Sequence, residues 1–364
     1  MAALAAASMF TSCKQASDEP QVKVIQDRVI EITYNTFDFI ENASYLNKYD
    51  PLGACSAVRV DIDGKHYVGR DYDFYCSDAP AVIVRNNGGA IKTVGICNSP
   101  ASFDPWTGED YQVRPAVLTS APFLCCDVMS EAGLYAETNI RPKEEALVCT
   151  STNPGKTRLC TQAFMQIMLS QYSTIDEIIA HVDDYDWFDL QQMGFEQSFF
   201  ITDQSGRSVL FEFGANKCVW EESPVNANFY VNKELYAIEK QGCGELRLAK
   251  ELEYLPNVKS EADIFTMMKR GAYDQFYHAD VDLDYAIPEY YDNIGYDKDS
   301  YAADPEGARE ACRKVVDEFS QYTWEERVAN KSWESVFITA ANVSDLVLNV
   351  HFSEHYNLDF TVTF

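Results

Sequence analysis

The sequence predicts an α+β fold in which antiparallel β-sheets lie between layers of helices. Its patterns come in blocks: strands first, then a pair of helices, then strands, helices and strands again. That order argues against alternating βαβ units, and we find no internal repeat. The 364 residues are 46% apolar and 13% aromatic, which is enough for one large core behind an N-terminal appendage.

The first folded element is predicted within residues 22–40. Val22, Ile25, Val29 and Ile32 fit one face of a helix, although β-branched residues dominate the segment. We interpret residues 21–54 as an N-terminal helical segment or propeptide. It ends at Asp50-Pro51-Leu52-Gly53-Ala54, where proline and glycine favour an exposed, bent link.

The next stretch, residues 54–74, is typical of a β-hairpin. Apolar and polar side chains alternate up to the two-residue turn Asp63-Gly64, after which the chain returns in the opposite direction. The hairpin begins at Cys55, and its return strand carries Arg70 and Asp73. It therefore brings a thiol close to a cation and a carboxylate.

The rest of the chain continues the same pattern. Residues 127–133 are expected to be a turn, and residues 271–303, rich in Tyr and Asp, a long surface insertion. Helices are expected at Thr157–Tyr172, after a cap at Thr174, at Glu245–Glu253, at Ser260–Met268 and from Asp304 to Phe319. Strands are expected at Ala81–Arg85, Ala90–Cys97, Leu134–Ile140, Phe195–Asp203, Arg207–Phe213, Ala227–Val231, Ser335–Ala340, Leu346–Val350 and Phe360–Phe364.

The charge of the chain restricts its partners. The formal net charge is -28, so the surface repels nucleic acid and anionic membranes. An anionic small-molecule substrate would need a local positive pocket. The sequence leaves open whether the protein forms a homo-oligomer.

No cofactor or metal is expected. The 11 cysteines show no paired C-x-x-C spacing, so a zinc ribbon is not indicated, although one or two disulfides stay open for an exported protein. His351-Phe-Ser-Glu354-His355 matches a zinc pattern, but that pattern needs a helix and here joins two strand-like runs. The acidic residues Asp280, Asp282 and Asp284 lack the glycine and closing glutamate of a calcium loop.

The first residues bear on location. Ala2 to Phe10 is an apolar run too short to span a bilayer, and Thr11-Ser12-Cys13 follows it. This start resembles a bacterial lipoprotein signal with Cys13 as the lipidated residue, although the basic n-region is missing. We therefore expect residues 1–20 to be a signal and tether, and the protein to be exported to the cell envelope, periplasmic or on the surface. The alternative is a disordered, alanine-rich tail.

The signature Gly69-Arg70-x-x-Asp73-Phe74, together with Cys55, resembles the start of the mature chain in a known family. These are the choloylglycine hydrolases and penicillin V acylases, which hydrolyse linear amide C–N bonds, with their acid-ceramidase-like relatives. The resemblance implies an N-terminal-nucleophile hydrolase with a four-layer αββα fold over residues 55–364. It also implies that a precursor cleaves itself before Cys55, which becomes the N-terminal nucleophile.

Three further positions fit this family's pattern. Asn139 ends the stretch Gly133-Leu134-Tyr135-Ala136-Glu137-Thr138-Asn139, and Arg247 follows the small-residue turn Gly242-Cys243-Gly244. Asn232, after Phe229-Tyr230-Val231, is the best match for a second asparagine, with Asn226 and Asn228 as competitors. Asparagine at a strand end is also ordinary turn chemistry, so each match alone is weak.

The residue types suit amide hydrolysis. A freed α-amine on Cys55 has a pKa near neutrality and acts as a base without any histidine. Arg70 is expected to lower the pKa of the thiol, and Asp73 to orient the ammonium group. Asn139 and Asn232 would donate hydrogen bonds to the oxyanion. Arg247 would order Asp73 by bidentate pairing.

Several alternatives remain at this point. The substrate is an N-acyl compound such as a bile-acid conjugate, a fatty-acyl amide or an acylated amino acid, and transfer of the acyl group to an amine would use the same site. A papain-like thiol protease would need a Cys–His pair, which none of the histidine contexts provides. An exported binding lipoprotein without enzyme activity would explain the N-terminus, but not Cys55, Arg70 and Asp73.

Overall fold

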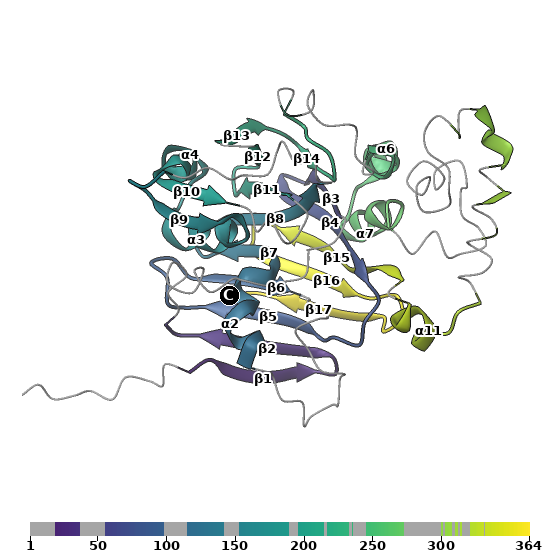
Figure 1. Ribbon diagram of the computed structural model, residues 1–364, viewed down its shortest axis with the longest axis horizontal. Coiled ribbons are helices and arrows are strands. Elements are labelled where there is room, and N and C mark those ends of the chain that lie inside the picture. The colour runs from purple at the N-terminus through teal and green to yellow at the C-terminus, as the bar shows by residue number, and fades with distance from the viewer. Residues whose placement is uncertain are drawn as a thin grey trace, which may run out of the picture.

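Two β-sheets that face each other form the centre of the protein. The computed structural model describes residues 19–36, 55–97, 115–141, 153–188, 196–214, 217–232, 235, 245–272, 300, 303–307, 310–311, 314, 321–330 and 332–364. Figure 1 shows the strands running through the middle of the molecule, with helices on either side.

The larger sheet has nine strands in the order β1-β2-β5-β6-β7-β8-β11-β12-β13. Neighbouring strands are antiparallel except β2 and β5, which are parallel. Its strands are β1 (Gln21–Gln26), β2 (Val29–Tyr34), β5 (Ala81–Asn86), β6 (Thr93–Cys97), β7 (Cys125–Ser130), β8 (Leu134–Arg141), β11 (Glu196–Asp203), β12 (Ser208–Gly214) and β13 (Lys217–Glu222).

The smaller sheet has six strands in the order β14-β3-β4-β15-β16-β17, all antiparallel. The predicted hairpin forms two of its central strands. The strands are β3 (Cys55–Ile62), β4 (Lys65–Tyr75), β14 (Val225–Asn226), β15 (Trp333–Asn342), β16 (Val347–Phe352) and β17 (Leu358–Val362).

Helices cover the outer face of each sheet. On the nine-stranded sheet these are α3 (Phe164–Gln171) and α4 (Ile175–His181), with the shorter α2 (Pro115–Ser120) and the 3₁₀ turn η3 (Ala121–Leu124). On the six-stranded sheet they are α6 (Glu245–Tyr254) and α7 (Glu261–Lys269). A separate apolar cluster fills the space between the sheets. The predicted four-layer αββα arrangement is therefore confirmed.

The N-terminal segment corrects the sequence prediction. Residues 21–26 and 29–34 form β1 and β2, not a helix. The β-branched side chains favour strands over a helix. Val29, Ile30 and Ile32 on β2 are fully buried, and β2 pairs with β1 on one side and with β5 on the other. In Figure 1 this hairpin forms the lower edge of the larger sheet. Residues 37–54, which complete the predicted propeptide, lie outside the described residues.

Other boundaries shift for similar reasons. The predicted helix at Thr157–Tyr172 begins at Phe164, because β9 (Thr157–Cys160) pairs in parallel with β10 (Tyr185–Phe188). The predicted turn at 127–133 is shorter, since β7 continues to Ser130. Strand pairing after β13 occurs at Val225–Asn226, ahead of the predicted Ala227–Val231. The caps at Thr174 and Ser260 are confirmed.

Further expectations concern the outer segments. Most of the predicted insertion 271–303 and helix 304–319, and all of residues 1–18 with Cys13, lie outside the described residues. The last described helix is α11 (Trp324–Ala329). Within the described part of the chain, no helix has the length and apolar character needed to cross a bilayer.

Candidate active site

Local geometry places Cys55 opposite Tyr72 and beside Arg70. Asp63 and Gly64 both have positive φ angles, 50° and 78°, which is the conformation of a tight two-residue hairpin turn. This turn sets the register in which Cys55 pairs with Tyr72 and Ala57 with Arg70. The residue before Arg70 must be small, because a Cβ on Gly69 would lie 2.6 Å from Ile264 of α7.

Arg70 projects into the space between the two sheets, where it is fully buried. Its Nη2 lies 3.3 Å from Cys55 Sγ and donates to the Thr138 carbonyl at 2.8 Å. Its Nη1 donates to Asp127 at 2.6 Å, and its Nε donates to Glu137 at 3.2 Å. Each edge of the guanidinium is thereby engaged, which fixes its position beside the thiol.

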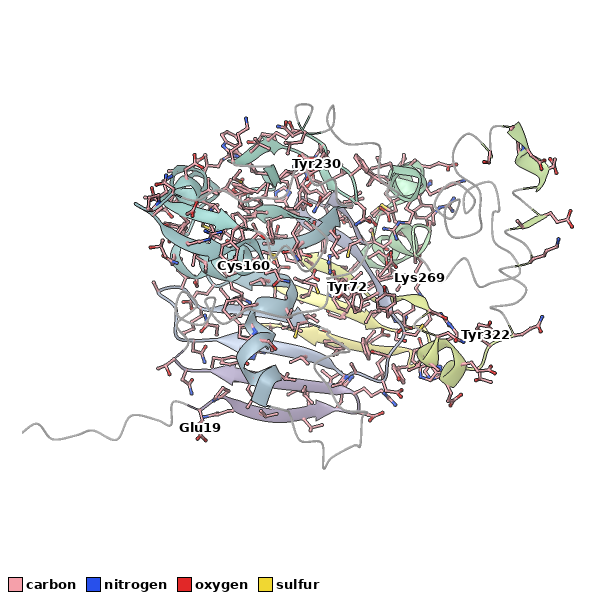
Figure 2. All side chains as sticks on the ribbon, viewed as in Figure 1. Glu19, Tyr72, Cys160, Tyr230, Lys269 and Tyr322 are labelled. Carbon is pink, nitrogen blue, oxygen red and sulfur yellow. The ribbon has the colours of Figure 1, made fainter. Side chains whose placement is uncertain are left out.

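Aromatic rings and a second layer of polar groups hold this arrangement. The Tyr72 ring stacks on Phe337 with centroids 4.6 Å apart, and Arg70 lies 5.0 Å from the Tyr72 centroid. Tyr72 lies near the middle of the molecule (Figure 2). Asp127 also accepts hydrogen bonds from the hydroxyls of Tyr135 and Thr339. Arg70 is therefore held from both sheets.

The electrostatic setting of Cys55 differs from the sequence expectation. Burial raises the pKa of the thiol well above its usual value, and this outweighs the lowering by Arg70. The charges of Asp73, Cys126 and Glu137 raise it further. The thiol is therefore protonated near neutral pH, and a base must remove its proton before it can attack a carbonyl group.

A second buried arginine supports the backbone nitrogen of Cys55. This nitrogen donates to Asn228 Oδ1 at 2.9 Å, and Arg247 Nη2 donates to the same oxygen at 2.9 Å. Arg247 Nη1 forms an ion pair with Asp73. Asp73 also accepts a hydrogen bond of 2.6 Å from Ser335. Arg247 therefore bridges Asp73 and Asn228.

Asn139 lies on the face of β8 that points toward Arg70. Side chains alternate along a strand, so Asn139 shares a face with Tyr135, which contacts Asp127, and with Glu137, which contacts Arg70. Asn139 is fully buried, and among the described residues nothing hydrogen-bonds to its amide nitrogen or oxygen. A buried amide of this kind is available to a ligand.

The structure places a different asparagine beside Cys55 than the sequence suggested. Asn228 contacts the Cys55 nitrogen, whereas the side chain of Asn232 donates to Glu221 at 3.5 Å and its backbone nitrogen to Glu212. The competing Asn226 donates to Glu137 at 2.7 Å. Asn226 pairs with Ala57 in the short strand β14, and this register brings Asn228 level with Cys55.

Sequence reasoning did not identify Asp127, Glu137 or Ser335. Glu137 stands in the stretch that ends at Asn139, and its spacing of two residues, which puts both side chains on one face of a strand, is the available signal. Burial raises the pKa of Glu137 to about 7, against the lowering by Arg70 and by the hydrogen bond from Asn226. Asp127 and Ser335 come from distant strands and carry no local signal. Among the described residues, no three His, Cys, Asp or Glu side chains are placed to hold a metal ion.

In comparisons with known proteins, this chain is similar only to solved structures, at low sequence identity. No protein-family model matches the sequence, and a search of curated proteins finds no match. A mutant of conjugated bile acid hydrolase from Clostridium perfringens is 11% identical, with a TM-score of 0.41, covering 85% of this chain and 92% of that one. A second variant of that hydrolase is 13% identical, with a TM-score of 0.42 and the same coverage of 85% and 92%.

Penicillin V acylase from Agrobacterium tumefaciens is 13% identical, with a TM-score of 0.41, covering 85% of this chain and 86% of that chain. At these identities and TM-scores, the likeness does not indicate what this chain does.

Proposed function

We propose that the protein is an N-terminal-nucleophile hydrolase that cleaves the linear amide bond of an N-acyl compound, with Cys55 as nucleophile. One observation carries the proposal: the sulfur of Cys55 contacts one buried arginine, and its nitrogen shares an acceptor with a second buried arginine. Arg70 contacts the Cys55 sulfur at 3.3 Å, while Arg247 and the Cys55 nitrogen share Asn228 Oδ1. A cysteine that only filled a core would have no need of two buried cations.

The proposal requires cleavage of the Ala54–Cys55 bond. In the precursor the nitrogen of Cys55 is an amide and cannot accept a proton. The thiol would attack the Ala54 carbonyl carbon, the C–N bond would break as the nitrogen takes up a proton, and water would hydrolyse the resulting thioester. Asn228 would then accept a hydrogen bond from one N–H of the freed amine. The lone pair of the amine nitrogen would stay available as a base.

Hydrolysis of the substrate would follow the same path. The amine takes the thiol proton, which the high pKa of the buried thiol makes necessary. The sulfur attacks the substrate carbonyl, and the Asn139 amide donates a hydrogen bond to the oxyanion. The amine returns its proton to the leaving nitrogen, and the acyl group stays on sulfur as a thioester. Water, activated by the same amine, releases the acid. An acyltransferase would differ in this last step alone, with an amine as acceptor.

A substrate screen tests the proposal. The purified full-length protein is assayed on bile-acid conjugates, fatty-acyl amides and acylated amino acids. Cys55→Ala serves as the inactive variant. Cys97→Ala is the matched control, because Cys97 is also buried but lies in the core between the nine-stranded sheet and its helices. We expect turnover of at least one amide class by the wild type and by Cys97→Ala, and none by Cys55→Ala. Equal turnover by all three proteins would contradict the proposal.

We also propose export and a lipid anchor, on the basis of the sequence Thr11-Ser12-Cys13 after an apolar run. Metabolic labelling with a fatty acid tests this directly. The wild-type chain should carry the label in the membrane fraction, and Cys13→Ser should not. Label retained by Cys13→Ser would contradict the anchor without bearing on catalysis.

A further inference from the structure

A group of buried acids lies on the opposite face of the hairpin from Arg70. Asp71 and Asp73 are two residues apart on β4, so both side chains point toward α6, where Glu251 and Arg247 lie. All four residues are fully buried. One guanidinium cannot balance three carboxylates away from water, so at least one acid is expected to keep its proton.

The contacts identify Asp71 as that acid. Among the described residues, no group donates a hydrogen bond to either oxygen of the Asp71 carboxyl. Its polar neighbours are the Ser335 hydroxyl and the Asp73 carboxyl. Ser335 has one hydroxyl hydrogen, which it donates to Asp73 at 2.6 Å. Both neighbours thus present lone pairs to Asp71, and only a protonated Asp71 can bond to them.

The other acids of the group have donors of their own. Asp73 accepts from Arg247 and Ser335, and Glu251 accepts from the Ser56 hydroxyl at 2.5 Å. Burial raises the pKa of Asp71 well above its usual value, and the charges of Asp73 and Glu251 raise it further, against the lowering by Arg247 and by the Ser335 hydroxyl. Among the described residues, Asp73, Glu251 and Arg247 are thus the charged groups that act on Asp71.

We propose that Asp71 is a positioning residue that stays neutral and donates its proton in a hydrogen bond toward Ser335 and Asp73. This bond fixes the Asp73 carboxylate, which holds Arg247, which in turn holds the Asn228 oxygen against the Cys55 nitrogen. The role extends the proposed function, on which it rests, because it prepares the nitrogen that is to become the catalytic base.

The neutral state is tested by stability against pH, without any substrate. Asp71→Asn keeps an uncharged donor of the same shape, and it is compared with its parent by urea unfolding of the full chain in a Cys55→Ala background, which keeps every sample uncut. A carboxyl that holds its proton only in the folded chain weakens folding as the pH rises. We therefore expect the ratio of the folding constants, Asp71→Asn over parent, to rise by up to tenfold per pH unit above about pH 4.

Asp345→Asn is the matched control of opposite sign. Asp345 is exposed, and its hydrogen bond with Lys65 lowers the pKa of its carboxyl, so this ratio should fall as the pH rises toward about 4. A ratio for Asp71→Asn that falls or stays flat would overturn the neutral assignment. Asp71→Ser is a second neutral donor, and failure of both neutral variants to fold would also overturn it.

The positioning role is tested by turnover in the otherwise wild-type chain. Asp71→Asn should keep kcat within a few-fold, whereas Asp71→Val, which cannot donate, should lower kcat more than tenfold with little change in KM. Equal kcat in both variants would overturn the role. If the wild type hydrolyses no amide, the proposed function fails, and the unfolding ratios still decide the protonation of Asp71.

Discussion

Cys55 carries both the proposed nucleophile and the proposed base, and substitutions test them. Cys55→Ala removes the sulfur, so we expect no amide hydrolysis and no cleavage at Ala54–Cys55. Cys55→Ser keeps an oxygen nucleophile that is weaker at neutral pH, and its turnover should fall strongly. Turnover assays with intact mass of each variant measure both effects. Normal turnover by a folded Cys55→Ala protein would exclude the mechanism.

The two predicted oxyanion asparagines differ in their surroundings, and this gives a paired test. The buried Asn139 amide on the side of Arg70 has no hydrogen-bond partner within the described part of the chain, whereas the Asn232 amide donates to Glu221. Asn139→Ala should lower kcat by about 100- to 1,000-fold, as loss of one oxyanion donor does. Asn232→Ala should lower kcat less than tenfold. The reverse order would assign the oxyanion to the second position.

Glu137 gives a test by pH, because its charge raises the pKa of the Cys55 thiol. Glu137→Gln removes that charge and should shift the pH profile of Cys55 alkylation, followed with iodoacetamide, toward lower pH. The rates should separate above about pH 7, where the wild-type Glu137 is ionised. Glu222→Gln, an exposed carboxylate paired with Arg207, is the control and should match the wild type. A shift of the Glu137→Gln profile toward higher pH would contradict this account of the site.

At this scale the sequence predicts what a short segment can encode. Cys55, Arg70 and Asp73 lie within one hairpin, so their spacing alone places them together. The choice among Asn226, Asn228 and Asn232 depends on the register of a strand that pairs with β3 through residues 225 and 226. No local pattern fixes that register. Burial of the thiol likewise depends on the opposite sheet, which reverses the expected effect on its pKa.

Among the elements, β2 is held firmly in the larger sheet. It pairs with β5 from Val29 opposite Ala81 to Tyr34 opposite Asn86, and Arg28 lies 3.7 Å from the centroid of the Tyr356 ring. Glu31 pairs with Arg85 at 2.6 Å. Strands β1 and β2 are thus part of the larger sheet, although they precede the proposed cleavage point.

We therefore expect the N-terminal fragment to stay bound after cleavage. The two chains should co-elute under native conditions and separate in denaturant. Ile30→Ala, at a fully buried position, should cost about 2–5 kcal/mol of unfolding free energy. Ile25→Ala, where the side chain is 40% exposed, is the control and should change it by less than about 0.5 kcal/mol. Loss of the fragment without any loss of stability would contradict this role for β2.

The elements also show where sequence patterns are sufficient. The layer order and most strands follow from blocks of alternating residues. The helix prediction for the N-terminal segment is wrong because its apolar spacing fits a helix and a strand equally well. Pairing with β5, which lies further along the chain, favours the strand. The start of α3 shifts because β9 finds a partner far along the chain.

For the whole molecule, the central claim is that the active protein begins at Cys55. The thiol of Cys55 is protonated and lies beside Arg70, so it needs a base. The nitrogen of Cys55, which Asn228 and Arg247 hold in place, can act as that base once cleavage makes it an amine. The direct measurement is intact mass with N-terminal sequencing of the purified protein, on the same sample that is assayed for amide hydrolysis. We predict that the catalytic chain starts at Cys55 and that activity scales with the cleaved fraction. A fully active enzyme in which residues 19–54 remain covalently joined to Cys55 would contradict the account.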